Sequence, residues 1–367
     1  MNLGTSSSRI RLHLFTMDLQ SGAGDRIERR RPSSPKSLRF PRRRRCPYCS
    51  IAPISWRAIA DSIGSSSLSG RFVTAPPVQE PCISIVIAAY DDWPALERCL
   101  QNLSVQNQPP EFEVIVVDDG SQTPVPSSIS GRSELRLSSI RLPHSGISSA
   151  RNHGIRLAKG TILLFTDCDC ILDRDCLKRL ANHAADYPQD DFFQLHLVGD
   201  IESSAGRAEH LQLSTVQQER NVSTGHLKYL NTSGFAIRRE SPYLEPELFD
   251  PKARRGEDTL LLSRLMRDGH LPRYLPDAII QHAVQLTLPR YVLKGLPSGY
   301  LEGYAYAKMR AEGIRVSSSR RVRWKLLTRS AKSSGASASG FVALTTVVAR
   351  QALNWVGAAL YRISHLS

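Results

Sequence analysis

Apolar residues between positions 81 and 165 fall into short continuous runs, and the segments between these runs place apolar residues at helical spacing. Short runs bounded by turn residues are typical of buried strands, and spacings of three and four residues are typical of helices. The expected order is a strand over 83–89, a helix over 96–105, strands over 112–117 and 137–142, a helix over 146–158 and a strand over 161–165. This alternation predicts an α/β fold with a doubly wound, mostly parallel sheet.

The segments on either side of this region are different in character. Residues 1–78 lack sustained periodicity and contain arginine blocks at 29–31 and 42–45, which favour a solvated, extended chain. An organellar transit peptide and a start codon assigned too far upstream are alternative interpretations of this segment. We expect three parts: a disordered basic segment over 1–78, a folded domain over 79–285, and a helical basic extension over 286–367.

The last apolar segment, residues 341–361, has about the length of a membrane span, but Arg350, Gln351 and Asn354 stand near its middle. This pattern favours an amphipathic helix that lies on a membrane or packs on the domain. Six Lys and Arg residues between positions 320 and 332 fit attraction to anionic lipid. A solvated basic linker followed by an ordinary terminal helix is the alternative.

Charge is distributed unevenly along the 367 residues. The formal net charge is +14, with +9 over residues 1–80 and +11 over residues 281–367, so the stretch between them carries −6. Basic flanks suit an anionic membrane surface or loose nucleic-acid contact, whereas an acidic centre argues against a core that reads nucleic-acid bases. The seven cysteines are odd in number, which indicates reduced thiols in a cytoplasmic protein. Cys46 and Cys49 form a lone C-x-x-C pair, which we interpret as incidental.

Asp167 and Asp169 form a D-x-D pattern directly after the strand expected over 161–165. The carboxyl ends of strands are where open α/β sheets bind ligands, and alternate residues of an extended segment point the same way. Two carboxylates aimed at one point suit a divalent cation that also binds phosphate. Three further signals lie where their elements would line the same crevice: 85–92 at the end of the first strand, 116–121 at the end of the second, and 146–154 at the start of a helix.

With these signals in order, residues 81–285 resemble the family 2 glycosyltransferases, enzymes of GT-A fold that transfer a sugar from a nucleotide diphosphate donor. Later matches strengthen the resemblance: 231–239 is similar to the family's acceptor-side strand, and 256–265 to its helix that begins with Glu-Asp. The resemblance implies a metal-dependent, inverting, non-processive enzyme. It would act on a saccharide, lipid-linked or metabolite acceptor, with UDP-sugar as the expected donor.

The resemblance also assigns roles on the donor side. Ala89 and Tyr90 would pack against the nucleobase, and Asp118 or Asp119 would accept a hydrogen bond from its ring N–H. Arg151 would lie near the phosphates and ribose; a helix-surface ion pair is the alternative for this residue.

Metal and catalytic roles follow from the same resemblance. Asp169, helped by Asp167, would hold Mn²⁺ or Mg²⁺, with His282 either a further ligand or a polar strand end. Asp258 would be the general base that deprotonates the acceptor hydroxyl, unless it and Glu257 merely place negative charge at a helix N-terminus.

The sequence departs from the family's processive members, because Arg320 stands where their Q-x-x-R-W motif has glutamine, which disfavours polymer synthesis. Two competing interpretations remain. A sugar nucleotidyltransferase of the same fold would carry a glycine-rich phosphate loop after the first strand, which residues 88–92 do not form. A non-catalytic nucleic-acid or membrane-binding protein with a degenerate core would keep its function without Asp169 and Asp258. We expect a cytoplasmic enzyme, peripheral on the membrane through its basic flanks, with no specific nucleic-acid partner.

Overall fold

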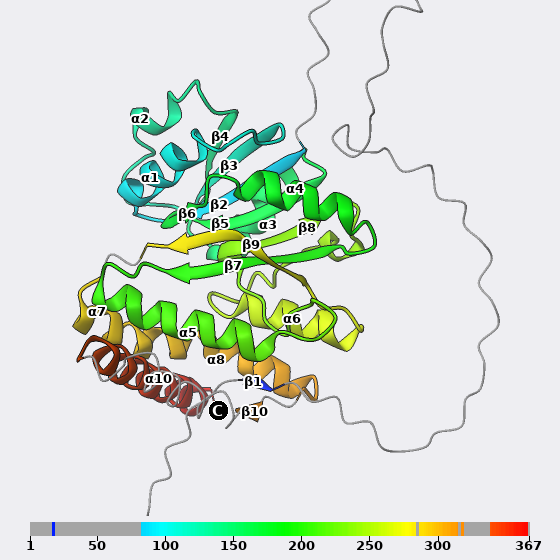
Figure 1. The fold of residues 1–367 in the computed structure, drawn as a ribbon. Helices are drawn as coiled ribbons and strands as arrows, with labels where there is room; N and C mark the ends of the chain where they lie inside the picture. The colour runs from blue at the N-terminus through cyan, green and yellow to red at the C-terminus, as the bar shows by residue number, and fades with distance from the viewer. Residues whose placement is uncertain (1–16, 19–81, 284–285, 315–316, 319–337, 366–367) are drawn as a thin grey trace, which may run out of the picture.

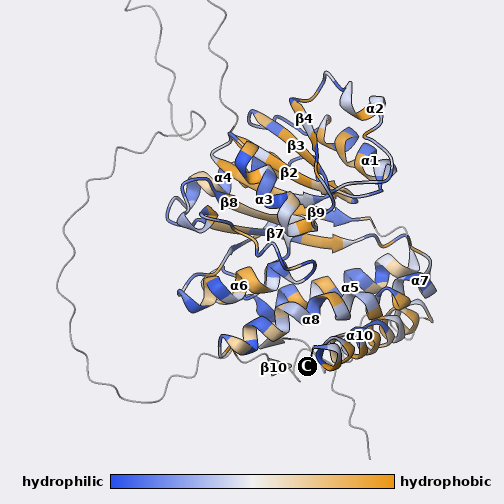
Figure 2. Cartoon of the chain, turned by 180° about the vertical axis from the view of Figure 1, so that it is seen from behind, coloured by the Kyte–Doolittle hydropathy of each residue, from blue (hydrophilic) through white to orange (hydrophobic). Residues whose placement is uncertain are grey.

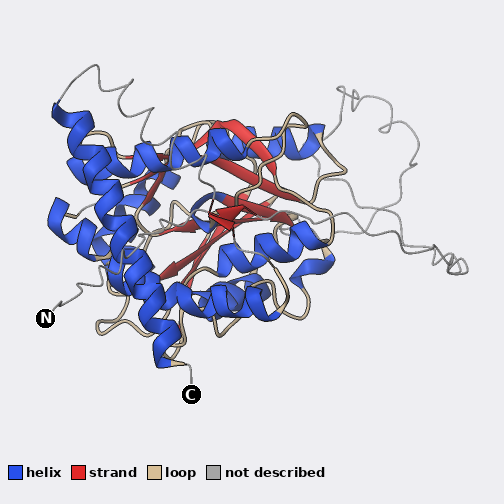
Figure 3. Cartoon of the chain, turned by 90° about the horizontal axis from the view of Figure 1, so that it is seen from below, coloured by secondary structure: helices blue, strands red, loops and turns tan. Residues whose placement is uncertain are grey.

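The computed structural model describes residues 17–18, 82–283, 286–314, 317–318 and 338–365 (Figure 1). The C-x-x-C pair, both arginine blocks and the basic residues between 320 and 332 lie outside the described residues. The described chain forms an eight-stranded sheet with helices on both faces, and a further group of helices lies beside the sheet at the bottom of Figure 1 (Figures 1 and 3).

The sheet has the strand order β4-β3-β2-β5-β8-β7-β9-β6. Strands β4, β3, β2 and β5 are parallel, β8 is antiparallel to both β5 and β7, β7 is parallel to β9, and β6 is antiparallel to β9. The strands are β2 (Ile83–Ala89), β3 (Phe112–Asp118), β4 (Leu137–Arg141), β5 (Ile162–Asp167), β6 (Cys170–Leu172), β7 (Phe192–Gly199), β8 (Phe235–Arg238) and β9 (Arg273–His282). A separate two-stranded sheet pairs β1 (Met17–Asp18) with β10 (Ser317–Ser318). The expected α/β fold is confirmed, with antiparallel pairs in the second half of the sheet.

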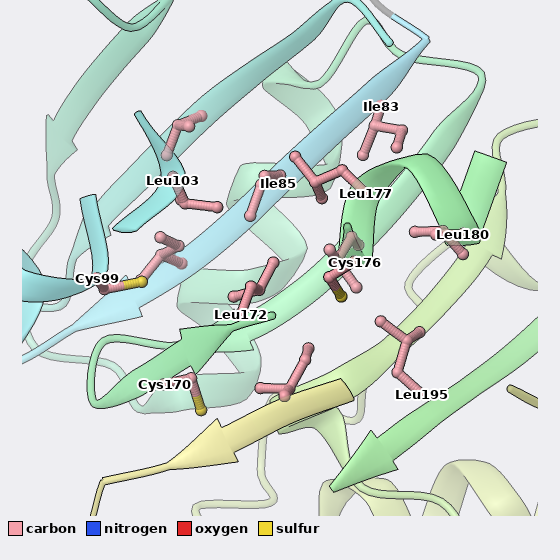
Figure 4. Close-up of a cluster of buried hydrophobic side chains, with 14 of the residues drawn as sticks. Ile83, Ile85, Cys99, Leu103, Cys170, Leu172, Cys176, Leu177, Leu180 and Leu195 are labelled. Carbon is pink, nitrogen blue, oxygen red and sulfur yellow. The ribbon is translucent and has the colours of Figure 1, made fainter. Parts of the chain in front are cut away.

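Helices cover both faces of the sheet. Those of the main domain are α1 (Trp93–Leu103), α2 (Ser127–Ser130), α3 (Ile147–Leu157), α4 (Cys176–Asp186), α5 (Ser204–Arg220) and α6 (Glu257–Arg267), with 3₁₀ turns at Thr232–Gly234 and Pro242–Leu244. On one face α1 and α4 bury Leu103 and Leu177 in the same hydrophobic cluster as Ile85 (Figure 4). On the other face α3 and α6 bury Ala150 and Leu261. Burial of both faces explains why the central strands are apolar without alternation.

Close approach of α3 to the sheet depends on Gly154. A Cβ at this position would lie 2.4 Å from Val86 Cγ1 in β2, so a larger residue would push the helix away. Because α3 carries Arg151 and begins beside the carboxyl end of β3, this contact fixes the position of a candidate site residue.

The C-terminal part forms α7 (Leu288–Leu293), α8 (Gly295–Ala311) and α10 (Ala338–Ser364). Helices α8 and α10 run parallel, because Gly295, Gly299 and Gly303 meet progressively later residues of α10. A Cβ on Gly299 would lie 1.8 Å from the Asn354 carbonyl oxygen, so the two backbones touch. Among the described residues, no helix combines the length and hydrophobicity needed to cross a bilayer.

Candidate active site

The D-x-D acids stand at the carboxyl end of β5, as the sequence predicts, but their environments differ. Both Asp167 oxygens have partners: Arg151 Nη2 lies 2.5 Å from Oδ1, and Ser233 Oγ donates to Oδ2 at 2.6 Å. Burial would raise the pKa of Asp167, but Arg151 and Ser233 hold it below its ordinary value. Asp167 is therefore an ionised carboxylate already committed to protein partners, which suits an indirect role beside a metal.

Asp169 meets His282 at the end of the sheet. The His282 Nε2 atom lies 3.2 Å from Asp169 Oδ1, and its Nδ1 atom lies 2.8 Å from Glu209 Oε2. Burial alone would lower the pKa of His282, but the hydrogen bonds with Asp169 and Glu209 raise it well above its ordinary value. Backbone pairing brings His282 here, because β9 places it opposite Cys170 of β6.

This cluster fits a divalent cation. One oxygen of Asp169, the Cys170 sulfur and one nitrogen of His282 lie within 4.8 Å of one another. A carboxylate on the second nitrogen of a histidine is the usual outer partner of a metal-binding imidazole, and Glu209 fills that position. Burial and the neighbouring acids raise the pKa of the Cys170 thiol well above its ordinary value, which makes it a poor ligand. Cys170 is fully buried, and its sulfur lies beside Asp169 rather than pointing away from it.

Arg151 is buried between two acids rather than exposed to a crevice. Its side chain is 1% exposed, and its two terminal nitrogens lie 2.5 Å from Asp167 Oδ1 and 2.5 Å from Glu257 Oε1. Thr232 Oγ1 donates to the same Glu257 oxygen at 3.2 Å. Of the two interpretations of Arg151, an ion pair is present, but it is internal and joins the end of β5 to the start of α6. A direct contact with donor phosphates stays a prediction.

Asp258 lies in the first turn of α6, beside Glu257. Gly256 precedes the helix with φ +78°, a left-handed conformation that favours glycine, and offers no capping side chain. Burial, then the charges of Glu257 and of Glu302 from α8, raise the pKa of Asp258 to about 7, against the opposing effects of the Thr259 N–H and Arg255. A carboxylate with a pKa near neutrality is suited to accept a proton.

The acids after β3 are held by the protein's own backbone. Asp118 is fully buried and accepts from Ser121 N at 2.8 Å. Asp119 is 4% exposed and accepts from Ser145 N at 2.8 Å and Gly146 N at 3.0 Å. These bonds tie the β3 end to the start of α3. Contact of either carboxylate with a nucleobase stays a prediction and would require this loop to rearrange.

The end of β2 presents an aromatic side chain. Tyr90 is 47% exposed, and its ring centroid lies 4.6 Å from that of His144 at an angle of 37°. Ala89 is 1% exposed, and its carbonyl accepts from Asp119 N at 2.9 Å. Of the two residues predicted to pack against a base, Tyr90 therefore offers a side-chain surface and Ala89 is part of the core.

Four residues near the site lack a sequence signal that would single them out: His144, Glu209, Tyr229 and Glu302. Glu209 lies in α5, which matches no motif. Burial, then the charges of Asp258 and Glu209, raise the pKa of the Tyr229 phenol, so this residue lies near both the predicted base and the histidine cluster. The fold thereby brings together acids at the end of β5, the histidine at the end of β9 and acids at the start of α6.

The fold and the site define a class: the chain has the GT-A fold of glycosyltransferases. A mannosyltransferase from Pyrobaculum calidifontis, solved with GDP-Man and Mn²⁺, matches with a TM-score of 0.54 over 79% of this chain and 89% of that one, at 17% identity. Residues 84–244 match the model described as Glycosyl transferase family 2, and this domain belongs to that family.

Curated relatives agree with this assignment. The chain is 28% identical to a pre-mycofactocin glycosyltransferase of Mycobacterium tuberculosis, over 54% of this chain and 42% of the relative. It is 26% identical to an N-acetylglucosaminyltransferase of Rhizobium meliloti, over 62% of this chain and 58% of the relative. The chain thus spans about half the length of these relatives.

Proposed function

We propose that this protein transfers a sugar from a nucleoside diphosphate donor to an acceptor hydroxyl, in one metal-dependent displacement that inverts the anomeric centre. The observation that carries the proposal is the buried Arg151. It holds Asp167, beside the candidate metal cluster, and Glu257, beside the candidate base Asp258, on two sides of one guanidinium. The proposed donor site and the proposed base are thereby linked through one buried ion-pair network.

On the donor side, the exposed ring of Tyr90 is the surface on which a nucleobase stacks, next to His144. Asp118 and Asp119 shape this site through the loop they hold, and UDP is the donor nucleotide that we expect. Because the Pyrobaculum enzyme was solved with GDP-Man, guanine donors belong in the same test.

Metal binding is assigned to Asp169 and His282, with Asp167 in support and Glu209 orienting the imidazole. Mn²⁺ or Mg²⁺ held there would offset the negative charge that develops on the diphosphate leaving group. The chain's own contribution is positional: the β5 and β9 ends hold the two ligands, and Arg151 keeps Asp167 ionised.

On the acceptor side, Asp258 removes the hydroxyl proton. Its pKa of about 7 makes the carboxylate a stronger base than an ordinary aspartate, while it remains largely ionised just above neutral pH. The acceptor oxygen then attacks the anomeric carbon from the face opposite the diphosphate. The acceptor that we propose is a hydroxyl of a glycan, a lipid-linked saccharide or a metabolite.

Calorimetry tests the donor site first. UDP, GDP, dTDP and ADP are titrated into the full chain with Mn²⁺ and with EDTA. We expect UDP binding that requires the metal and that Asp169→Ala and His282→Ala abolish. Asp186→Ala is the matched control, since this acid is exposed at the last residue of α4. It should bind UDP as the wild type does.

The second step separates binding from catalysis. Asp258→Asn should retain UDP and Mn²⁺ binding but lose transfer from a UDP-sugar to an acceptor in a screen of glycans and lipid-linked saccharides. Selective binding of GDP would mean that the donor is a GDP-sugar, and the proposed transfer reaction would stand. Failure of every nucleotide to bind a folded protein would refute the proposal.

A further inference from the structure

The polar residues near the middle of helix α10 face the protein interior, whereas a helix exposed to water places them on its outer side. Arg350 turns toward the domain, donates to the Tyr291 carbonyl at 3.1 Å, and lies 4.0 Å over the Tyr291 ring. Asn354 also faces inward and donates to Glu302 of α8 at 3.2 Å. Two of the polar residues that argue against a membrane span therefore bond inside the protein, although the Asn354 Oδ1 atom is buried there without a hydrogen-bond partner.

The outer face of α10 is apolar along its whole length. It exposes six large apolar side chains: Phe341, Val342, Val348, Val356, Leu360 and Ile363. Thr345 lies on the same face, but its hydroxyl donates to carbonyls of its own helix, at 3.0 Å from the Phe341 and Val342 oxygens. Among the exposed residues from 341 to 363, Arg362 near the C-terminal end carries the charge.

Helix α8 also exposes apolar surface. Its Tyr300, 38% exposed, packs edge-on against Tyr361 of α10 with ring centroids 5.5 Å apart. Helices α5 and α8 separate α10 from the sheet, so this face lies at the outside of the molecule (Figures 1 and 2). A contiguous apolar surface of this kind marks an interaction site in a water-soluble fold.

The charge of this part of the chain indicates which partner would bind the outer face of α10. The sequence from residue 313 to 367 contains nine Lys and Arg residues and no Asp or Glu. Among described residues, Arg310 of α8 and Arg362 of α10 lie close enough for the charge of Arg362 to add to burial in lowering the pKa of Arg310. Two copies packed face to face would bring like charges together, whereas an anionic lipid surface attracts them.

We propose that the outer face of α10 docks this protein on an anionic membrane surface, with the helix lying in the plane of the interface. An interfacial helix of this type buries its apolar side chains to a depth of about 5–10 Å. Docking leaves the inner bonds of Arg350 and Asn354 intact, because the helix stays packed on α8. This inference goes beyond sugar transfer and does not depend on it.

Vesicle sedimentation of the full chain tests the proposal. The lipids are phosphatidylcholine alone and phosphatidylcholine mixed with phosphatidylglycerol, each at low and high salt. We expect binding to the anionic vesicles that falls as salt rises. Phe341→Glu combined with Ile363→Glu should weaken it by about tenfold or more. These two side chains are 68% and 67% exposed, so their replacement leaves the core unchanged.

The matched control replaces two exposed apolar residues elsewhere, Val105→Glu with Ile201→Glu, which are 44% and 57% exposed. It adds the same charge and should bind as the wild type does. Every variant keeps the same basic segments, so a difference between the two pairs reports the face itself. Ile363→Glu alone serves as a milder variant, and circular dichroism confirms the fold of each.

Three results would overturn the proposal. The first is that neither vesicle type retains the wild type, and the second is that both double variants bind as well as the wild type. The third is a dimer in sedimentation velocity that the Phe341→Glu/Ile363→Glu variant loses, with no vesicle binding. That last result would assign the face to a second copy of the chain.

Discussion

Replacing Asp258 by asparagine is expected to stabilise the folded protein at alkaline pH. In the unfolded chain this carboxyl has its ordinary pKa of 3.8, whereas in the fold the pKa is about 7. Between these values the unfolded chain releases the proton and the folded chain retains it. The stability that the protonated group contributes is therefore present below pH 3.8 and is lost as pH rises to about 7.

The magnitude follows from the pKa difference. A difference of one is worth about 1.4 kcal/mol. Relative to acidic pH, the carboxyl therefore costs about 1.5 kcal/mol of stability at about pH 5, where the folded chain retains its proton, and about 4 kcal/mol at about pH 8, where the buried group is ionised. Asparagine is neutral and nearly the same size, so it avoids this cost at both pH values. The gain in unfolding free energy should therefore be about 2.5 kcal/mol larger at about pH 8 than at about pH 5.

Urea denaturation of the wild type and Asp258→Asn at the two pH values measures this difference. Asp186→Asn, at the exposed end of α4, is the matched control and should show the same unfolding free energy as the wild type. A gain for Asp258→Asn that is equal at both pH values would refute the reasoning, because it would show an ordinary carboxylate. If Asp258→Asn is more stable than the wild type but loses sugar transfer, Asp258 serves the reaction at a cost to the stability of the fold.

Other predictions follow from the same geometry. Arg151→Met leaves the buried Glu257 and the partly buried Asp167 without their cation and should cost about 3–5 kcal/mol in urea denaturation; a cost below about 1 kcal/mol would argue against these ion pairs. Gly299→Leu should displace α10 from α8 and make it sensitive to limited proteolysis, and unchanged resistance would contradict the tight packing. Glu302→Gln removes a charge that raises the pKa of Asp258, so the rise of kcat/KM with pH should move to lower pH, not higher. Tyr90→Ala should weaken UDP binding by about tenfold in calorimetry, and equal affinity would exclude stacking on this ring.

The first half of the sheet is predictable from sequence because its strands are continuous apolar runs. The strand expected over 83–89 coincides with β2, and the one expected over 112–117 is β3, which extends one residue further to Asp118. The second half is less predictable, since β6 has three residues and pairs with β9, about 110 positions away in the chain. Local periodicity carries no information about which distant strands pair.

The candidate site is likewise predictable from the sequence only in part. Asp167, Asp169 and Asp258 belong to short sequence patterns at element ends, so sequence alone singles them out. Glu209 has no such pattern; it reaches His282 because α5 packs against β7, which lies beside β9. Likewise the partners of Arg151 depend on the packing of α3 against the sheet, and a sequence motif cannot distinguish a phosphate contact from an internal ion pair.

The burial of Arg151 has a consequence for how the two halves of the site move. Taking one cation and two acids out of water costs free energy that their attraction recovers only when all three remain in place. Asp167 and Glu257 are therefore held at a fixed separation, and with them the ends of β5 and α6. A single displacement needs its leaving group and its attacking hydroxyl on opposite sides of one carbon, with little tolerance in distance. A rigid internal ion pair between the two sides would meet that need of the proposed reaction, which gives the buried Arg151 a role that requires no contact with the donor.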